Sequence, residues 1–457
     1  MKYFIETYGC QMNVHDSERM AGLLEQSGYD PAESDLDADI VVVNTCSVRE
    51  RAEEKLYTRL GEIKEMSREN GRDPLVVVAG CVAQQEGEKL IRRSKGVVDL
   101  VVGTQQVKML PMLVQKTAAE RPPLNEQWLA SGRPWRTEGR IAIENPYEDP
   151  SFPLGIVRRG DPVRAYVTII EGCNDFCAFC VVPYTRGHER MRSKAEILAD
   201  VRDAADSGRR EVQLLGQIVN HYQAPDNPSC DFPALLEAVH EVPGIQRIRF
   251  TSPHPIGYKK DLIEAFTYLP KLAEHVHLPV QSGSDAILKR MHRPYTTAKF
   301  SELVKRIREA RPDIAVTTDV IVGFPGETEG HYLETRNLFE DIRFDNAFVF
   351  RYSKRRGTPA AEMEEATQVP ERIKEERNQD LLALVNSIAL PMYDALVGQE
   401  VEILCEGPSK TNEARLTGRT GSNRIVVFEG NRDRHVGEIF KVRVNEAANF
   451  TLFGNPV

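Results

Sequence analysis

The sequence predicts an α/β protein in three parts: an N-terminal domain with a parallel sheet, a central partial (β/α)6 TIM-like barrel and a small C-terminal all-β barrel. Three observations lead to this prediction. Near the N-terminus, three short apolar runs each end in a cysteine, and these cysteines recur after 36 and 35 residues with helical patterns between them, which is the length of a βαβ unit. Six further strand patterns alternate with helical patterns between residues 161 and 390. From residue 392, apolar and polar residues alternate between glycine turns.

The composition limits the class of protein. The chain has 457 residues, of which 41% are hydrophobic and 28% are charged, which is ordinary for a protein with a sizeable core. The formal net charge of −9 excludes a surface that attracts nucleic acid as a whole, so RNA binding requires local basic patches. Eight cysteines without a signal peptide favour a reducing compartment, and no apolar run approaches the roughly 18 residues of a membrane helix. We therefore expect a cytoplasmic protein whose cysteines bind metal or take part in catalysis.

The predicted N-terminal domain, residues 1–117, carries a cysteine after each of its three strands. The strands are predicted at residues 3–5, 40–43 and 75–78, with helical patterns such as 16–26 and 49–68 between them. The cysteines that follow the strands are Cys10, Cys46 and Cys81. Because ligands bind outside the carboxyl ends of parallel strands, the three thiols are expected to converge. Free cysteines often serve as small core residues, but three at matching positions favour an iron–sulfur cluster.

Residues 118–160 are predicted to be an extended linker. The segment contains six prolines and shows no sustained periodicity. Its two tryptophans, Trp128 and Trp135, are expected to pack against a neighbouring domain.

The central domain, residues 161–390, is predicted to contain six parallel strands. They are expected at residues 164–170, 211–215, 247–251, 276–280, 314–322 and 346–352. A capping box of Ser193 and Glu196 marks the start of the first helix. A long helix is expected from Pro370 to about Leu390, and Pro391 is expected to end or kink it. Active sites of such barrels lie at the carboxyl ends of the strands.

The loop after the first central strand contains the pattern Cys-x3-Cys-x2-Cys, formed by Cys173, Cys177 and Cys180. Three thiolates cannot complete a tetrahedral structural zinc site. They are enough for a cubic iron–sulfur cluster whose fourth iron stays open, and an open iron can bind a small molecule and pass it an electron. A zinc knuckle that borrows His188 and three unrelated buried cysteines are the alternatives.

With Phe179 before the last cysteine, this loop resembles that of the radical S-adenosylmethionine (SAM) enzymes. In that family the open iron chelates SAM, and electron transfer cleaves its sulfonium to a deoxyadenosyl radical, which is chemistry of the cofactor. Glycine-containing turns after later strands are similar to the SAM-binding turns of the family. Gln217 replaces the usual acidic residue, and Ile218 departs from the Asn that this branch more often has. The resemblance implies SAM-binding roles for Phe179, Gly216, Gln217, Gln281, Ser282, Asp319 and Gly323.

Two three-cysteine groups in this order resemble the methylthiotransferase branch of the radical SAM enzymes. The segments 8–13, 44–50 and 80–87 are similar to those of the MiaB-type enzymes, which methylthiolate isopentenyl-adenosine beside the anticodon of tRNA. The sister branch that modifies a ribosomal-protein aspartate typically has Pro-Lys-Asn where this chain has Gln11-Met12-Asn13. The segment 181–187 also matches the tRNA-directed branch. We read Arg186 within it as a catalytic charge near SAM or the substrate phosphate, with a surface salt bridge as the alternative.

The resemblance implies two [4Fe-4S] clusters and two uses of SAM. An auxiliary cluster on Cys10, Cys46 and Cys81 would carry the sulfur, and the cluster on Cys173, Cys177 and Cys180 would cleave SAM. One SAM methylates the carried sulfur, and another yields the radical that removes hydrogen from C2 of adenine 37. The implied partners are a tRNA carrying isopentenyl-adenosine, a flavodoxin- or ferredoxin-type electron donor and a sulfur donor. A monomer is expected.

Residues 392–457 are predicted to form a small antiparallel barrel and resemble a TRAM domain, an RNA-binding barrel of tRNA-modifying enzymes. Eight basic residues are available for phosphate contacts, but nine acidic residues accompany them. RNA binding therefore follows from the resemblance and not from the composition.

Three other functions are alternatives to this interpretation. The first is the same chemistry on threonylcarbamoyl-adenosine of tRNA or on a ribosomal-protein aspartate. The second is a non-catalytic RNA-binding protein whose metals are structural or redox-sensing. The third, a nicotinamide-dependent enzyme, is disfavoured because no G-x-G-x-x-G follows the first strand.

Overall fold

The computed structural model describes residues 1–47, 50–121, 140–143, 157–448 and 450–457. The predicted contacts of Trp128 and Trp135 lie outside these residues. The contacts within the chain divide it into two compact units. The N-terminal unit contains residues 1–160 together with 171–175 and 181–190, and the C-terminal unit contains 161–170, 176–180 and 191–457.

The N-terminal unit is built on a parallel sheet of six strands, in the order β2-β1-β3-β4-β5-β6. The strands are β1 (Lys2–Tyr8), β2 (Asp30–Pro31), β3 (Ile40–Thr45), β4 (Leu75–Gly80), β5 (Leu100–Val102) and β6 (Arg140–Ala142). Every residue of β3 and β4 is buried, which explains their continuous β-branched sequences. The short strand β6 arises within the segment that was predicted to be a linker and extends the edge of the sheet.

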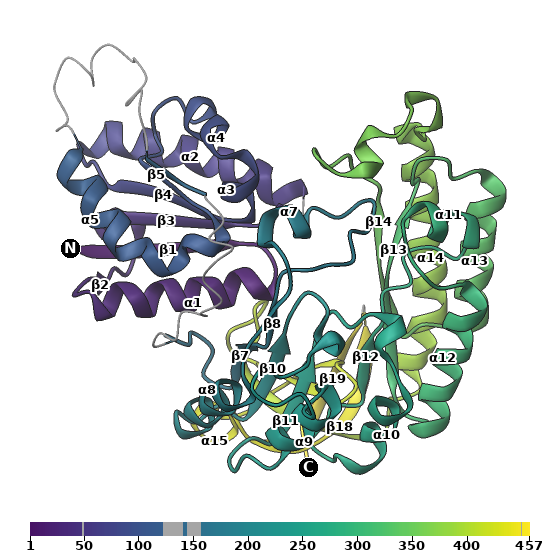
Figure 1. The fold of residues 1–457 in the computed structure, drawn as a ribbon. Coiled ribbons are helices and arrows are strands. Elements are labelled where there is room, and N and C mark those ends of the chain that lie inside the picture. Colours follow the sequence, from purple (N-terminus) through teal and green to yellow (C-terminus); the bar gives the residue numbers. More distant parts are fainter. Residues whose placement is uncertain (48–49, 122–139, 144–156, 449) are drawn as a thin grey trace. The chain divides into compact units, whose positions relative to one another are not determined.

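Helices cover both faces of this sheet (Figure 1). One face packs against α1 (Gln11–Gln26) and α5 (Leu110–Glu120), through residues such as Met20 and Leu110. The other face packs against α2 (Glu50–Asn70), α3 (Cys81–Glu86) and α4 (Glu88–Arg93). The turns η1 (Asp35–Asp37) and η2 (Thr104–Met109) and the short helix α7 (Val182–Arg186) complete the unit.

The C-terminal unit begins with six parallel strands at the predicted places. They are β7 (Arg164–Thr168), β10 (Glu211–Leu215), β11 (Arg247–Phe250), β12 (His275–His277), β13 (Ala315–Val322) and β14 (Asn346–Arg351). They form two sheets, β11-β10-β7 and β12-β13-β14. A parallel bridge pairs Ile248 of β11 with Leu272, which precedes β12 in the sequence. The six strands confirm the partial (β/α)6 barrel. The short strands β8 (Ile170–Glu171) and β9 (Arg190–Met191) flank the cysteine loop in the sequence.

The central helices pack on the outside of these strands (Figure 1). They are α8 (Lys194–Asp206), α9 (Phe232–His240), α10 (Lys260–Tyr268), α11 (Asp285–Arg290), α12 (Thr297–Ala310), α13 (Glu329–Ile342) and α14 (Glu371–Asp394). The predicted capping box is present: Ser193 Oγ accepts from the Glu196 amide at 3.2 Å, and Glu196 Oε2 accepts from the Ser193 amide at 3.1 Å. Short 3-10 turns lie at η3 (Val219–His221), η4 (Pro255–Gly257), η5 (Pro359–Glu362) and η6 (Glu365–Thr367).

Pro391 does not end the long helix, whereas the predicted kink stays a prediction. Pro391 lies inside α14, which continues to Asp394. The proline removes one amide from the helix, but the Ala395 amide donates to the Pro391 carbonyl at 3.0 Å and restores the pattern. Beyond the proline, Tyr393 is buried in the core of the C-terminal barrel. Packing therefore sustains the last turn.

The C-terminal barrel is closed by five strands in the order β15-β16-β17-β19-β18. The strands are β15 (Glu400–Pro408), β16 (Leu416–Thr420), β17 (Ile425–Phe428), β18 (Ile439–Ala448) and β19 (Thr451–Pro456), with α15 (Arg432–His435) between the third and fourth. The prediction of an all-antiparallel barrel needs one correction, because β17 and β19 pair in parallel. The strand β18 lies between these two in the sequence, so their connection is a crossover.

Arginines at the amino ends of central strands hold the C-terminal barrel in place. Arg249 donates to the carbonyls of Thr420 at 2.6 Å and Gly421 at 3.1 Å, and Arg247 donates to the Arg419 carbonyl at 2.7 Å. The buried Glu211 carboxylate accepts from Arg249 Nε at 3.0 Å and from Arg164 Nε at 2.6 Å. Arg164 also pairs with Glu406 of the C-terminal barrel. One buried carboxylate thus organises the arginines that join the two barrels.

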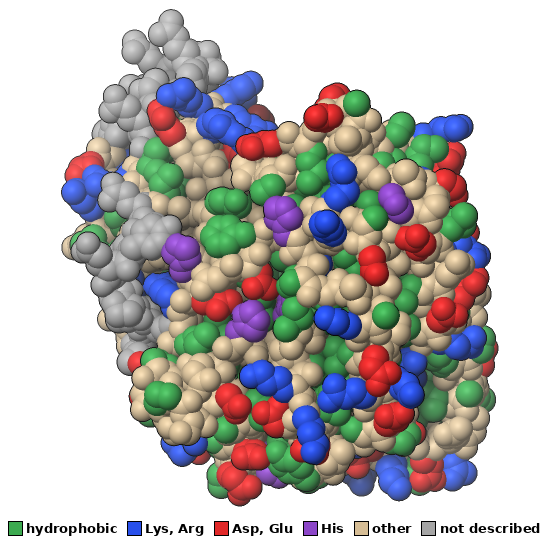
Figure 2. Space-filling view, turned by 45° about the vertical axis from the view of Figure 1, so that its right-hand side comes forward, with side chains coloured by type: hydrophobic (Ala, Val, Ile, Leu, Met, Phe, Trp, Pro, Cys, Tyr) green, Lys and Arg blue, Asp and Glu red, His purple; other side chains and the backbone are tan. Residues whose placement is uncertain are grey.

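Basic and acidic side chains are interspersed on the face shown in Figure 2, in keeping with the net charge. None of the helices in the described residues combines the length and the apolar character that crossing a membrane requires.

Candidate functional site

The structure brings together the three cysteines of the N-terminal sheet. Cys10 precedes α1, Cys46 follows β3, and Cys81 is the first residue of α3. The thiols of Cys10 and Cys46 are hydrogen-bonded to each other, and Cys81 is close enough to Cys10 for their charges to interact. The approach is tight, since a Cβ on Gly9 would lie 2.9 Å from the Cβ of Cys46. Parallel strands that end at one edge of the sheet bring about this convergence.

Two buried asparagines, Asn13 and Asn44, connect the segments that carry Cys10 and Cys46. The Asn44 amide nitrogen donates to the Asn13 carbonyl at 2.8 Å and to Ser17 Oγ at 2.9 Å, and Asn13 Nδ2 donates to Asn44 Oδ1 at 3.2 Å. Asn13 Oδ1 also lies 3.4 Å from both the amide and the Sγ of Cys10. Gly80 has a φ of +92°, and a Cβ there would clash with Asn44 Oδ1 and lie 2.6 Å from the Thr45 carbonyl oxygen. The sequence motifs contained both asparagines, but their connecting role was not predicted.

The protonation of the thiols follows from their neighbours. The hydrogen bond from Cys46 lowers the pKa of Cys10 to about 5, against the effect of burial and with help from the Arg186 guanidinium. Burial raises the pKa of Cys81, while Arg186 opposes that rise. Cys10 is therefore a thiolate at neutral pH, which is the form that binds metal.

Arg186 lies beside these thiols. It is buried, and its Nη2 donates to Asp16 Oδ2 at 2.6 Å. Burial by itself would lower the pKa of Arg186, but Asp16 and Cys81 outweigh it and hold the pKa well above its ordinary value. Among the described residues, its recorded partners include Asp16, Cys10 and Cys81, and a role beside SAM or a substrate phosphate stays a prediction.

The loop with Cys173, Cys177 and Cys180 is shared between the two units. In the N-terminal unit, the Cys173 amide donates to the Gly187 carbonyl at 3.0 Å. In the C-terminal unit, the Ala178 amide donates to the Met291 carbonyl at 3.0 Å, and Phe179 packs against an apolar cluster that includes Phe324.

Arg293 is a neighbour of this loop that sequence reasoning missed. Its Nη1 lies 3.4 Å from the Cys177 Sγ. A cation at a cysteine sulfur stabilises the thiolate that a cluster needs. It comes more than a hundred residues after the cysteine, so nothing in the local sequence pointed to it.

Several of the predicted SAM residues follow central strands. Gly216 and Gln217 directly follow β10, and a Cβ on Gly216 would lie 3.3 Å from the Cβ of Ile170. Gln217 Oε1 is buried and has no hydrogen-bond partner among the described residues. An unsatisfied buried acceptor is costly, so this oxygen is available to a donor such as an ammonium group.

Gln281 and Ser282 follow β12. Gln281 has a φ of +68°. Its amide donates to the Asp319 carbonyl and its carbonyl accepts from the Ile321 amide, both at 2.9 Å, so Gln281 pairs with β13 beside Val320. Ser282 is buried with its Oγ 3.4 Å from Thr335 Oγ1. Nearby in sequence, the buried Ser284 Oγ has no partner within the described chain. This strand end therefore also offers an unpaired polar atom.

Asp319 and Gly323 belong to the fifth strand and its turn. Asp319 Oδ1 lies 3.3 Å from His277 Nε2. The Gly323 amide donates to Glu327 Oε1 at 2.7 Å, and Arg377 Nη1 donates to the same oxygen at 2.8 Å. The turn is thus held rigidly by charged hydrogen bonds.

The donor sets fit iron–sulfur clusters better than a single metal ion. Within the described residues, no group of three His, Cys, Asp or Glu side chains is close enough to bind one ion. In a cubic cluster each thiolate binds a different iron, so its ligands stand farther apart than the ligands of one ion. All eight cysteines are free of disulfides, which leaves the six thiols available.

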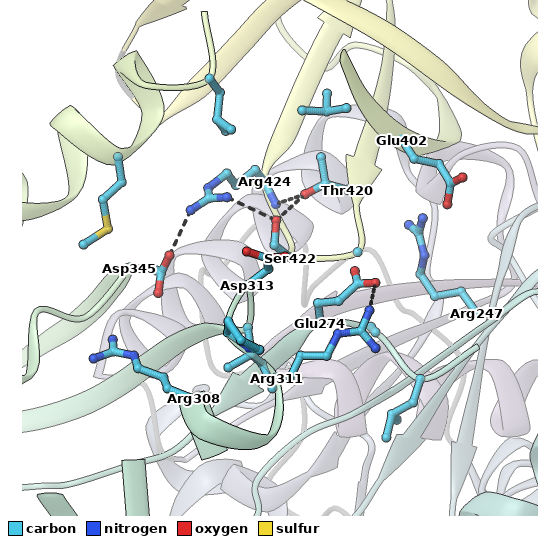
Figure 3. A pocket seen from close by; sticks show the side chains of 18 of the residues that line it. Arg247, Glu274, Arg308, Arg311, Asp313, Asp345, Glu402, Thr420, Ser422 and Arg424 are labelled. Atoms are coloured by element: carbon cyan, nitrogen blue, oxygen red, sulfur yellow. Dashed lines mark hydrogen bonds and ion pairs between the residues drawn. The ribbon is translucent and has the colours of Figure 1, made fainter. Parts of the chain in front are cut away.

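A cavity of about 820 Å³ lies away from these strand ends, between the amino ends of central strands and the C-terminal barrel (Figure 3). In Figure 3, Arg424 lies between Asp345 and Ser422, and Arg311 pairs with Glu274 at 2.5 Å. Its described lining has six basic and six acidic side chains, so it favours neither sign of charge. We therefore do not assign the chemistry to this cavity.

Three family models match the chain in succession. They are the uncharacterized protein family UPF0004 at residues 2–103, the radical SAM superfamily at 167–339 and the TRAM domain at 394–457. The tRNA-2-methylthio-N(6)-dimethylallyladenosine synthase of Akkermansia muciniphila is 47% identical over 100% of this chain and 98% of its own length. The enzyme of the same name from Carboxydothermus hydrogenoformans is 44% identical over 99% of this chain and 98% of its own length.

The chain belongs to the tRNA-2-methylthio-N(6)-dimethylallyladenosine synthase family. It is a radical SAM enzyme of the methylthiotransferase class, as the sequence motifs predicted. The fold also resembles the radical S-adenosylmethionine methyltransferase TsrM of Kitasatospora setae, with a TM-score of 0.59 and 15% identity over 79% of this chain and 77% of that one. The TRAM match confirms the predicted C-terminal barrel.

Proposed function

We propose that this protein adds a methylthio group to C2 of isopentenyl-adenosine at position 37 of tRNA. One observation carries the proposal: three thiols converge at the N-terminal sheet edge. The same chain has the SAM-type cysteine loop and is 47% identical to a named synthase over its full length. A radical SAM enzyme that only methylates needs no second three-thiol site. Insertion of sulfur gives that second site a purpose.

The two clusters would be held by different cysteines. Cys10, Cys46 and Cys81 would hold the auxiliary cluster, and Cys173, Cys177 and Cys180 the SAM cluster. When bound, the auxiliary cluster supplies the sulfur, and the SAM cluster supplies the electron that cleaves SAM. The C2 carbon of adenine offers neither an acidic proton nor a leaving group, which is why radical chemistry is required.

The residues of the chain bind and orient the reactants. Arg293 donates to Cys177 and favours its thiolate form. The unpaired oxygens of Gln217 and Ser284 would bind polar groups of SAM. The predicted SAM contacts of Phe179, Gly216, Gln281, Ser282, Asp319 and Gly323 belong to the same proposal.

The proposed partners follow from the reaction. The substrate is a tRNA with isopentenyl-adenosine, bound with help from the basic residues of the TRAM domain. A flavodoxin- or ferredoxin-type protein supplies electrons, and a separate donor restores the sulfur. The enzyme acts as a monomer in the cytoplasm, where such tRNA is found.

The test is mass spectrometry of nucleosides from isopentenylated tRNA. The tRNA is incubated without oxygen with the reconstituted protein, SAM and a reductant. The expected product is the methylthio-isopentenyl nucleoside, together with deoxyadenosine. Cys177→Ala should abolish both, whereas Cys230→Ala, at a buried cysteine outside both groups, should retain them.

Other outcomes identify which part fails. Deoxyadenosine without the methylthio nucleoside would keep the SAM chemistry and reject the substrate. A methylthio product on threonylcarbamoyl-adenosine tRNA alone would favour that rival substrate. Neither product from protein with both clusters filled would overturn the catalytic proposal.

A further inference from the structure

Arg186 occupies a position at the N-terminal sheet edge that no cysteine fills. Three strands of this sheet, β1, β3 and β4, are followed by cysteines, whereas β5 is followed by Thr104 and Gln105. Thr104 Oγ1 donates to the Thr185 carbonyl at 2.5 Å, and Gln105 Nε2 donates to the Arg186 carbonyl at 2.7 Å. The fourth strand end therefore holds the backbone of the segment that carries Arg186.

The guanidinium of Arg186 is directed to the thiols by packing and by charge. Its helix α7 packs against α3, which begins at Cys81. The Arg186 side chain is close enough to Cys81 and Cys10 for its charge to lower the pKa of both thiols. Asp16, on α1 just after Cys10, fixes the other side of the guanidinium at 2.6 Å. Only 5% of Arg186 is exposed, so water cannot screen this charge well.

Ion pairs connect the surroundings of Arg186 to two further arginines and a second carboxylate. Arg19 pairs with Glu171 at 3.0 Å and lies 3.9 Å from Asp16, and Arg190 pairs with the other oxygen of Glu171 at 3.0 Å. Three guanidiniums thus face two carboxylates within this linked group. Buried charges need compensation, and the charge of Arg186 acts on the sulfurs of Cys10 and Cys81.

We propose that Arg186 is the cationic partner of the auxiliary iron–sulfur cluster, raising its reduction potential and holding the Cys81 sulfur in place. This inference rests on the proposed function, because it requires a cluster on Cys10, Cys46 and Cys81. Reduction adds negative charge to a cluster, and hydrogen bonds and positive charge at its sulfurs favour the reduced form. Arg186 is a positioning residue here, since it acts on the cluster and not on the substrate.

The proposal is tested by the reduction potential of the auxiliary cluster. The full chain with Cys173, Cys177 and Cys180 replaced by Ala holds this cluster alone and serves as the parent protein. On this parent, Arg186→Gln should lower the midpoint potential in a redox titration followed by electron paramagnetic resonance. Arg186→Lys, which keeps the charge, should shift it less, and Asp16→Asn should raise it. The surface variant Arg92→Gln should leave it unchanged, because that side chain is largely exposed and pairs with Glu88.

Iron and sulfide analysis distinguishes a failure of the auxiliary cluster site from a failure of the role of Arg186. A parent protein that is folded and holds no cluster would reject the proposed auxiliary site itself. A parent with a full cluster whose potential is the same in Arg186→Gln would reject only the role of Arg186. If Arg186→Gln does not fold, the potentials of Asp16→Asn and Arg186→Lys test the proposal, because they are expected to shift in opposite directions. An Asp16→Asn potential at or below that of the parent would overturn the proposal.

Discussion

Two buried groups of arginines and carboxylates, one in each unit, are similar in composition and differ in what their guanidiniums contact. Around Glu211, the nitrogens of Arg164, Arg247 and Arg249 meet carboxylate or backbone carbonyl oxygens. Around Asp16, the Arg186 guanidinium lies 2.6 Å from one carboxylate and close enough to two thiols for its charge to lower their pKa values. The first group joins two barrels, and the second faces sulfur. Burial of charge alone therefore does not indicate function, whereas the chemical identity of the partner does.

The two groups should respond differently to the loss of a carboxylate. At Glu211 the loss leaves the guanidiniums of Arg247 and Arg249 without this carboxylate and leaves Arg164 with Glu406 alone, so stability is the affected quantity. At Asp16 the Cys10 thiolate remains as an anion near Arg186, so the electronic state of a bound cluster is the affected quantity. The following variants test this contrast in order of expected effect.

The largest effect is expected for Glu211→Gln. Removing one partner of a buried ion pair typically costs about 3–5 kcal/mol, because the remaining charges are left uncompensated. Urea unfolding followed by circular dichroism would measure this loss. As a matched control, Glu274→Gln removes a carboxylate that pairs with Arg311 and is about one-third exposed, and it should cost less than about 1 kcal/mol. Equal effects of the two substitutions would contradict the organising role of Glu211.

A pH dependence follows from the same carboxylate. The flanking arginines, above all Arg249, outweigh the opposing effect of burial and lower the pKa of Glu211 from 4.5 to about 2. A depressed folded-state pKa stabilises the fold above the unfolded-state value of about 4.5, and this stabilisation is lost as the pH falls towards 2. The shift corresponds to a contribution on the order of 3 kcal/mol at neutral pH. The stability gap between wild type and Glu211→Gln, measured between pH 6 and 3, should narrow in acid, and a constant gap would refute the assignment.

A smaller effect on stability, with a large effect on cluster content, is expected for Gly80→Ala. A side chain at this positive φ costs about 1–3 kcal/mol of strain and also pushes against Asn44 and the Thr45 carbonyl. The displaced loop carries Cys81, so the iron bound after reconstitution should fall. Gly71→Ala is the matched control, since its φ is also positive at +65° and no atom lies within 4 Å of the added carbon. Unchanged iron in Gly80→Ala would argue against a role for Cys81 as a ligand.

The smallest effect is expected for Lys260→Ala. Lys260 pairs with Glu264 one helical turn away, and both side chains are largely exposed. Such pairs contribute about 0.3–0.5 kcal/mol, so urea unfolding should change by no more than that. A larger loss would show that the assay responds to any change of charge and would weaken the contrast between the two buried groups.

The sequence predicted the strands best where they are long or contained in strong motifs. The six central strands were placed within a few residues, because β-branched runs bounded by turns are a strong signal. The three-residue strands β5 and β6 were not predicted, since so short a run has no periodicity. Helix α1 begins at Gln11, whereas the sequence showed a helical pattern only from residue 16. The start was missed because Cys10, the residue before the helix, is not one of the common capping residues.

The sequence by itself determined the six cysteines, the order of the domains and the family, because these depend on spacing along the chain and on local patterns. Only the tertiary structure decided the surroundings of those cysteines. Asp16 and Arg186 are 170 residues apart, Arg293 and Cys177 are 116 apart, and Glu211 meets its arginines across neighbouring strands. The continuation of α14 past Pro391 and the parallel pair of β17 and β19 were also decided by packing. Contacts of this kind depend on which surfaces the folded chain brings together, and no local pattern of residues encodes them.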